Sequence, residues 1–257
     1  MFSRYVALGD STTEGLEDPY PDGRGYRGWA DRLAEHIAGV EPTLQYANLA
    51  VRGRKLGQIR SEQLEPALAF EPDLASILGG INDILRRHVD LDVLGGELAT
   101  MVAALRSAGA TVLLVTFPDP TRVIRVAGAP VRRRVAAFNE AIRAVAEEHG
   151  AVVADLERHG VSDPRLWCAD RLHANSHGHE RIAAAAIEAL GLAEPTRWWA
   201  QPLPGELPRR RLPAAVAQEA VWAGRHLAPW VLRRLRGVSS GDGRVAKRPA
   251  LEPVLRD

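Results

Sequence analysis

Short, mainly apolar runs alternate with longer amphipathic segments over about the first three quarters of the chain. The runs are typical of buried strands, and the amphipathic segments repeat their apolar residues at helical spacing. Strands that are apolar on both faces indicate a parallel sheet covered by helices on both sides. The expected strands are 5–8, 44–49, 73–78, 111–116 and 151–156, and the expected helices are 29–39, 56–70, 91–107, 132–149 and 182–190.

The pattern changes after Leu192. Five prolines between positions 195 and 213 interrupt the chain, and a helix is favoured over 214–235, interrupted at Pro229. From Ser239 the chain is rich in glycine, proline and charge, a composition typical of disorder. We therefore predict one α/β domain over residues 1–192 and a C-terminal extension over 193–257, partly helical and disordered at its end.

Charge is divided unevenly between these two parts. From Glu206 onward there are eleven Lys or Arg against five Asp or Glu, a net charge of +6; the remaining 22 and 27 give −5, and the whole chain carries +1. A nearly balanced total gives no reason to expect a nucleic-acid partner.

The helix expected in the extension is amphipathic and basic. Its apolar face can dock on the body of the protein and leave the arginines in water, which we favour, or it can make weak contact with an anionic membrane surface. The apolar residues are Trp222, Leu227, Trp230, Val231 and Leu235, and the basic ones are Arg225, Arg233, Arg234 and Arg236.

Cysteine content and the N-terminus bear on the compartment. Cys168 is the one cysteine, so an internal disulfide is excluded. The N-terminal residues lack the pattern of a secretion signal, and every apolar run is too short to cross a bilayer. The expectation is a cytoplasmic protein.

Polar residues follow two of the expected strands directly. Ser11 comes after the first strand, in Gly9-Asp10-Ser11, and Asn82 and Asp83 come after the third. Ligands of such sheets bind beyond the carboxyl ends of the strands, so these side chains are expected at the edge where chemistry takes place. A serine at this point is also common as a helix cap or turn residue.

Asp170 and His173 are spaced so that a carboxylate can reach one ring nitrogen and leave the other free. That arrangement suits a base that activates a serine hydroxyl, since free serine is a poor nucleophile. An ordinary surface pair on a loop has the same spacing. Asn175 or Ser176 is expected to cap the final helix just beyond.

Four segments together resemble the conserved blocks of the GDSL or SGNH hydrolase family, in the family's order. They are 9–15 (GDSTTEG), 48–53 (NLAVRG), 79–83 (GGIND) and 170–173 (DRLH). Thr12 stands where the family name implies leucine, and Ala174 where proline often follows the histidine. The resemblance implies a flavodoxin-like, three-layer α/β/α sandwich with a central parallel sheet, here of five strands, as the catalytic domain.

The resemblance also implies residue roles. Ser11 would be the nucleophile, His173 the base and Asp170 the residue that orients the base. The backbone N–H groups of Ser11 and Gly53 and the side-chain amide of Asn82 would form the oxyanion hole.

Asp10 and Asp83 are expected to support the loops of the site. The loops 14–28 and 117–130 are expected to form the pocket walls.

The function predicted is therefore serine-dependent hydrolysis of a small-molecule carboxylic ester through an acyl-enzyme, without a cofactor. Within this class two substrates stay open: a lipid or short-acyl ester, including lysophospholipid-like ones, and an O-acetylated sugar. A non-catalytic binding module on the same fold is a third hypothesis, and it would predict the loss of a triad or oxyanion residue.

Two other patterns are set aside. The segment 237–241 (GVSSG) matches a nucleophile elbow, but no strand precedes it. His173, His177 and His179 suggest a zinc cluster, but no nearby carboxylate or thiol completes a ligand set. No metal is expected.

Overall fold

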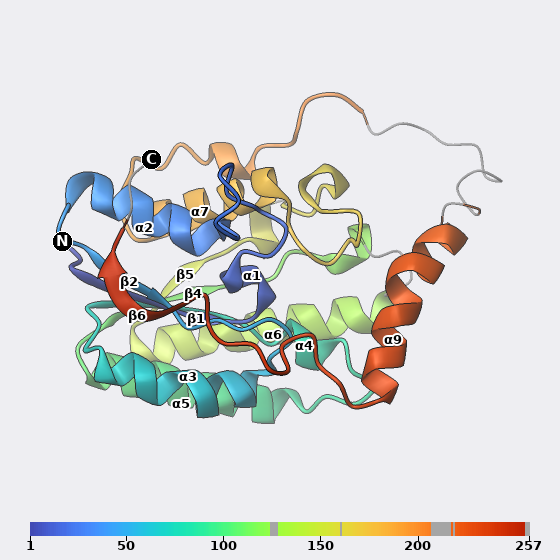
Figure 1. Cartoon of the computed structure of the whole chain (residues 1–257), viewed down its shortest axis with the longest axis horizontal. Coiled ribbons are helices and arrows are strands. Elements are labelled where there is room, and N and C mark those ends of the chain that lie inside the picture. The colour runs from blue at the N-terminus through green and yellow to red at the C-terminus, as the bar shows by residue number, and fades with distance from the viewer. Residues whose placement is uncertain (124–127, 160, 207–216, 218, 255–257) are drawn as a thin grey trace.

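The computed structural model describes residues 1–123, 128–159, 161–206, 217 and 219–254. Its centre is one sheet of six strands in the order β5-β4-β3-β1-β2-β6 (Figure 1). Five of them pair in parallel, in the flavodoxin-like order. The strands are β1 (Arg4–Gly9), β2 (Gln45–Asn48), β3 (Leu74–Leu78), β4 (Thr111–Val115), β5 (Val152–Ala154) and β6 (Arg248–Pro253).

Helices cover both faces of this sheet, as predicted. The pair α2 and α7 packs on one face, and α3, α5 and α6 pack on the other (Figure 1). Two single-turn helices, α1 and α4, directly follow β1 and β3. The bounds are α1 (Ser11–Glu14), α2 (Gly28–Val40), α3 (Leu56–Ala69), α4 (Ile81–Ile84), α5 (Leu91–Ser107), α6 (Gly128–His149) and α7 (Ser176–Ala189).

The predicted number of strands is wrong by one. β6 pairs antiparallel with β2 at the edge of the sheet, so the sheet has six strands and not five. β6 lies in the segment that was expected to be disordered. A composition rich in glycine, proline and charge did not reveal it, because its partner β2 lies some 200 positions earlier in the chain.

An ion pair between the partly buried Lys247 and the buried Asp31 anchors the segment just before β6. The Lys247 ammonium lies 2.9 Å from a carboxylate oxygen of Asp31 and donates to the carbonyls of Tyr26 and Arg27 at 2.8 and 2.9 Å. Asp31 also accepts from the Tyr46 hydroxyl at 2.8 Å. These bonds satisfy the ammonium, which explains why a lysine is tolerated at this position.

The extension also forms a helix that lies against the body. A π-helical turn, η6 (Ala223–Leu227), runs into α9 (Ala228–Leu235), so the expected interruption at Pro229 is a change of helical winding. Proline lacks the N–H that a regular ladder needs at this point. Residues 214–216 and 218 of the predicted helix, and the side chains of Trp230, Arg234 and Leu235, lie outside the described part of the chain.

Trp222 docks this helix on the loop 167–174. Its ring is buried, and its indole N–H donates to the Ala169 carbonyl at 3.0 Å. The Arg171 guanidinium lies 4.5 Å from the centre of the same ring and pairs with Glu219 at 2.6 Å. Docking of the extension, the interpretation we favoured, is therefore observed at Trp222.

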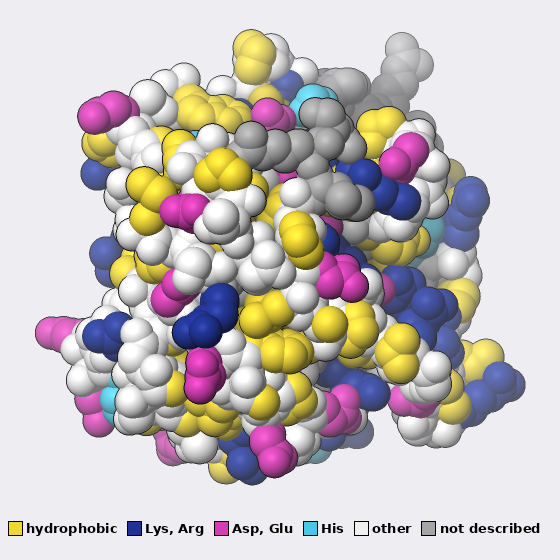
Figure 2. All heavy atoms as spheres, turned by 60° about the vertical axis from the view of Figure 1, so that its left-hand side comes forward, with side chains coloured by type: hydrophobic (Ala, Val, Ile, Leu, Met, Phe, Trp, Pro, Cys, Tyr) yellow, Lys and Arg dark blue, Asp and Glu magenta, His cyan; other side chains and the backbone are white. Residues whose placement is uncertain are grey.

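The surface carries its charges unevenly. Figure 2 shows Lys and Arg side chains gathered along one edge of the face, next to a mixed surface of acidic, basic and apolar side chains. None of the described helices combines the length and the apolar character that a membrane span requires.

Candidate active site

The end of β1 holds Ser11 in a rigid position. The buried Gln63 side chain accepts from the Gly9 N–H at 2.8 Å and donates to the Gly9 carbonyl at 2.9 Å. A Cβ at Gly9 would overlap the Leu78 carbonyl and Thr13, so this turn excludes larger residues. Asp10 then caps α1 by accepting from the Thr12 N–H at 3.2 Å.

Ser11 and His173 meet directly, although they lie 162 positions apart in the chain. The Ser11 Oγ is 2.9 Å from His173 Nε2, and His173 Nδ1 is 2.6 Å from Asp170 Oδ2. Because an ionised carboxylate only accepts, Nδ1 carries the proton and Nε2 accepts from the serine hydroxyl. This is the tautomer that a general base acting on Ser11 needs.

Asp170 is held in place by its own loop. Its Oδ1 accepts from the backbone N–H groups of Leu172 and His173 at 3.0 and 3.1 Å. Burial alone would raise the pKa of Asp170, but the hydrogen bond and charge of His173 outweigh this and hold the pKa below its usual value. Asp170 is therefore ionised at neutral pH and stabilises an imidazolium on His173.

The loop after β2 brings Gly53 to the same edge of the sheet. Gly53 has a φ of 77°, a conformation that favours glycine. The preceding Arg52 anchors the loop to α1: its N–H donates to Glu14 Oε2 at 2.8 Å, and its guanidinium pairs with the same carboxylate. Ser239 of the extension donates to the Gly53 carbonyl at 3.3 Å.

Asn82, in α4, is linked to the residue before the serine. Its Nδ2 donates to Asp10 Oδ2 at 3.1 Å and to the Arg54 carbonyl at 3.2 Å. An oxyanion formed at Ser11 would have to replace one of these acceptors. When Asp10 is ionised, the neutral Arg54 carbonyl is the weaker acceptor of the two, because charge-assisted hydrogen bonds are stronger.

Asp10 and Asp83, the two aspartates expected to support the loops, are both partly or fully buried and hold different backbone groups. Burial raises the pKa of Asp10 to about 7, with a further contribution from the nearby Asp83 charge, while the Thr12 and Asn82 hydrogen bonds act in the opposite direction. Asp83 accepts from the Leu56 N–H at 3.0 Å at the start of α3, and burial raises its pKa also. Both side chains brace backbone next to the site.

The other two histidines of the pattern set aside above have different environments. His179 is fully buried in α7: its Nδ1 accepts from the Trp29 N–H and its Nε2 donates to the Leu16 carbonyl, both at 3.2 Å. Burial lowers its pKa to about 4. His177 is exposed and lies 3.7 Å from Glu180. Within the described ranges, no group of three or more His, Cys, Asp or Glu side chains is placed to hold a metal ion.

Several residues that build the site had no such role assigned to them from the sequence. Gln63 fixes the end of β1, Glu14 and Arg52 join α1 to the Gly53 loop, and His179 joins α7 to the segment after α1. Asn175, in contrast, was predicted: its side chain accepts from the Gly178 N–H at 3.1 Å and caps α7.

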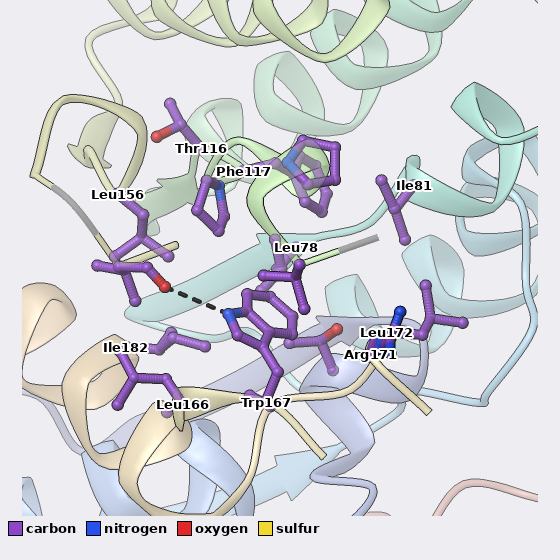
Figure 3. A pocket seen from close by; sticks show the side chains of 17 residues that line it. Leu78, Ile81, Thr116, Phe117, Leu156, Leu166, Trp167, Arg171, Leu172 and Ile182 are labelled. Carbon is purple, nitrogen blue, oxygen red and sulfur yellow. Dashed lines mark hydrogen bonds between the residues drawn. The ribbon is translucent and has the colours of Figure 1, made fainter. Parts of the chain in front are cut away.

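A small apolar cavity lies at the carboxyl ends of β3, β4 and β5, and its lining residues do not include Ser11 or His173 themselves. Its volume is about 50 Å³, and Thr12 and Leu172, the chain neighbours of the serine and the histidine, form part of its wall. Figure 3 shows the Trp167 ring on one side of the hollow and Phe117 on the other, with Leu78 between them. Of the two loops expected as walls, the segment around Phe117 contributes, whereas Tyr20 and Tyr26 of the loop 14–28 line a separate hollow.

A second, larger cavity is lined by His173 itself and shares Leu172 with the small one. Its volume is about 300 Å³, and Asp170 and His173 share its wall with the docked helix of the extension, including Trp222 and Arg225.

Comparison with known proteins relates this architecture to a family of hydrolases. A sequence profile of the GDSL-like lipase/acylhydrolase family matches residues 7–181, more than half of the chain. The acetylxylan esterase of Geobacillus stearothermophilus is 24% identical over 209 residues, which are 73% of this chain and 94% of that enzyme.

Solved structures share the fold. A crystal structure of the same Geobacillus acetylxylan esterase matches with a TM-score of 0.61 and 22% identity, over 74% of this chain and 94% of that one. The enzyme LAE5 from the metagenome of Lake Arreo, described as an α/β hydrolase, matches with a TM-score of 0.62 and 24% identity, over 74% and 95% of the two chains.

Proposed function

The chain belongs to the GDSL-like lipase/acylhydrolase family, and from this premise we propose that it hydrolyses short-acyl carboxylic esters with Ser11 as nucleophile, His173 as base and Asp170 as the acid that orients the base. The protein is a serine ester hydrolase, as its family and its esterase relatives indicate. The observation that carries the residue assignment is the continuous hydrogen-bond chain from Ser11 Oγ through the His173 ring to Asp170.

The first half of the reaction acylates Ser11. Its Oγ forms a bond to the acyl carbon while the hydroxyl proton passes to His173 Nε2, and the C=O electron pair moves onto the carbonyl oxygen. The N–H groups of Ser11 and Gly53 and the Asn82 amide are the donors proposed for this oxyanion. Collapse of the intermediate breaks the C–O bond to the alcohol, which takes the proton from Nε2.

The second half releases the acid. A water molecule in the place of the alcohol gives its proton to His173 Nε2 as its oxygen bonds to the acyl carbon. The second tetrahedral intermediate expels Ser11 Oγ, which recovers a proton from the imidazolium. Throughout, Asp170 stays ionised and keeps Nδ1 protonated.

The apolar cavity supports a short acyl group. A water-sized volume is about 10–15 Å³, so the cavity of about 50 Å³ suits an acetyl group and is too small to enclose a long fatty acyl chain. The acetylxylan esterase named among the relatives acts, by its name, on an acetylated sugar. A sugar O-deacetylase is therefore the second candidate, and it differs only in the alcohol part of the ester.

The proposal is tested with p-nitrophenyl esters of increasing acyl length. The acetate should be hydrolysed fastest, and Ser11→Ala should lower kcat for it by several powers of ten, as for other triad nucleophiles. The matched control is Ser61→Ala, an exposed serine on α3 that should leave the rate unchanged. Retained turnover in Ser11→Ala would remove Ser11 from the mechanism, and a preference for long acyl chains would remove the short-acyl assignment.

A further inference from the structure

The larger cavity beside His173 is built jointly by the body and the extension. From the body come Asp170, Leu172 and His173, and the extension adds Trp222, Arg225 and Arg233, among others. The extension lies beyond residues 7–181, the part of the chain that the family profile matches. The extension therefore supplies a wall of this cavity from outside the segment that the family profile matches.

The position of this cavity decides which part of an ester it receives. In acylation the base returns its proton to the oxygen of the leaving alcohol, so the alcohol must lie against His173. The apolar cavity beside Thr12 takes up the acyl side in the proposed reaction. The cavity of about 300 Å³ at His173 is then the space for the alcohol.

Charge in this cavity is predominantly positive. Arg225 and Arg233 both line it, and neither forms an ion pair with a carboxylate of the described residues. Arg171, on the adjoining loop, is by contrast paired with Glu219. Asp170, the one carboxylate in the wall, already accepts from the ring and the backbone N–H of His173.

Apolar surface accompanies these cations. Trp222 is buried and fixed by its bond to the Ala169 carbonyl, and Leu227 and Pro229 lie in the same wall. A guanidinium binds carboxylate and phosphate oxygens through several N–H groups in one plane. Two guanidinium groups beside an apolar wall thus fit an alcohol that carries an anionic group on a partly apolar frame.

We propose that Arg225 and Arg233 bind a carboxylate or phosphate on the alcohol part of the substrate, so that the enzyme selects anionic esters. This inference rests on the proposed function, since it takes His173 as the base. It names the substrate class more closely: a short-acyl ester of an alcohol that bears a phosphate or carboxylate within reach of the docked helix.

The test uses three aryl acetates that differ only in the para substituent of the leaving phenol. They are 4-acetoxybenzoate, 4-acetoxyphenyl phosphate and, as the neutral member, methyl 4-acetoxybenzoate. The value of kcat/KM is measured for the full chain and for Arg225→Gln and Arg233→Gln. Arg236→Gln is the matched control, because it removes the same charge from the turn directly after α9, outside the cavity. The ratio of variant to wild type cancels the intrinsic reactivity of each ester.

Each cavity variant should lower kcat/KM about tenfold for at least one anionic ester, because it removes a charge-assisted contact. The neutral ester should stay within about twofold for both variants, and Arg236→Gln should change none of the three esters beyond that. For the wild-type enzyme, added salt should lower kcat/KM for the two anionic esters and leave kcat/KM for the neutral ester unchanged. Whether the phosphate or the carboxylate loses more identifies the preferred anion.

An equal loss for neutral and anionic esters, or no loss for either, would overturn the anion assignment. That outcome differs from a failure of the proposed function, in which Ser11→Ala would still hydrolyse the neutral ester.

Discussion

Replacing Asp10 by asparagine should change the pH dependence of folding in a defined way. Asp10 lies next to the nucleophile and is 1% exposed. Its pKa is about 7 in the folded protein, against an ordinary value of 3.8. Between these two values the folded protein holds a proton that the unfolded chain has lost, so the wild type loses stability as the pH rises.

The magnitude follows from the two pKa values. A difference of about 3 in pKa corresponds to a loss of about 4 kcal/mol in the free energy of unfolding. This is the change from a pH at which Asp10 is protonated in both the folded and unfolded states to a pH at which it is ionised in both. The stability that protonated Asp10 gives the folded protein is fully present below about pH 4 and is lost as the pH rises through about 7. Over the interval from pH 5 to pH 8, the loss is about 2–3 kcal/mol.

The assay is urea unfolding of the wild type and Asp10→Asn at pH 5, 6, 7 and 8. Asparagine keeps an oxygen that can accept from the Thr12 N–H but does not ionise, so the variant should gain about 2–3 kcal/mol relative to the wild type between pH 5 and pH 8. His173 and Asp83 interact with Asp10, so the difference reports the ionisation of Asp10 together with its coupling to these two groups, whereas the contributions of distant titrating groups cancel. If the two free energies of unfolding differ by the same amount at every pH, Asp10 does not titrate as the structure indicates, and the reasoning from its burial is wrong.

Two further substitutions test separate parts of the molecule. Asp170→Asn should lower kcat for p-nitrophenyl acetate by about a thousandfold or more, because an amide no longer fixes the His173 tautomer or stabilises its charge; a loss below about tenfold would contradict the role of Asp170. Lys247→Met should lower the free energy of unfolding in urea by about 3 kcal/mol, because it leaves the buried Asp31 carboxylate without its cation; Arg133→Met, at an exposed position on α6, is the control, and an equal loss in both variants would argue against a specific bond at Lys247.

Much of the fold was readable from the sequence, because β1, β3 and β4 are almost wholly buried and so consist mainly of apolar residues. The bounds of α5 agree with the predicted helix, since Asp90 caps it by accepting from the Asp92 and Val93 N–H groups. β6 was missed because nothing local favours a strand there. Its pairing with β2 and the Lys247–Asp31 bond before it depend on residues that are distant in sequence.

The residues of the candidate site also fall into two groups, those that the sequence identifies and those that it does not. Ser11, Asp170 and His173 were predicted as one group, since short motifs mark each of them, and the structure brings their side chains into one hydrogen-bond chain. Gln63 and His179 act as single polar residues on ordinary helices, and their partners become neighbours only in the folded chain. Nothing in the local sequence distinguishes Gln63 from an exposed polar residue, whereas His179 follows the last of the four matched segments and agrees with its usual continuation in the family.

The position of the docked helix next to the site could not be predicted from the sequence either. The amphipathic pattern favoured docking, but it contained no information on which surface the helix would meet. The indole bond of Trp222 to the Ala169 carbonyl places the arginine-bearing helix beside His173. The extension therefore contributes to the walls of the site, which the division at residue 192 does not suggest.

Covalent labelling with an organophosphonate ester tests the central claim most directly, because it reports on the nucleophile itself. One phosphonyl group per chain should be found by mass spectrometry on the peptide that contains Ser11, activity should fall in proportion to labelling, and Ser11→Ala should remain unlabelled. Labelling of another residue with loss of activity, or full activity after complete labelling of Ser11, would contradict the account.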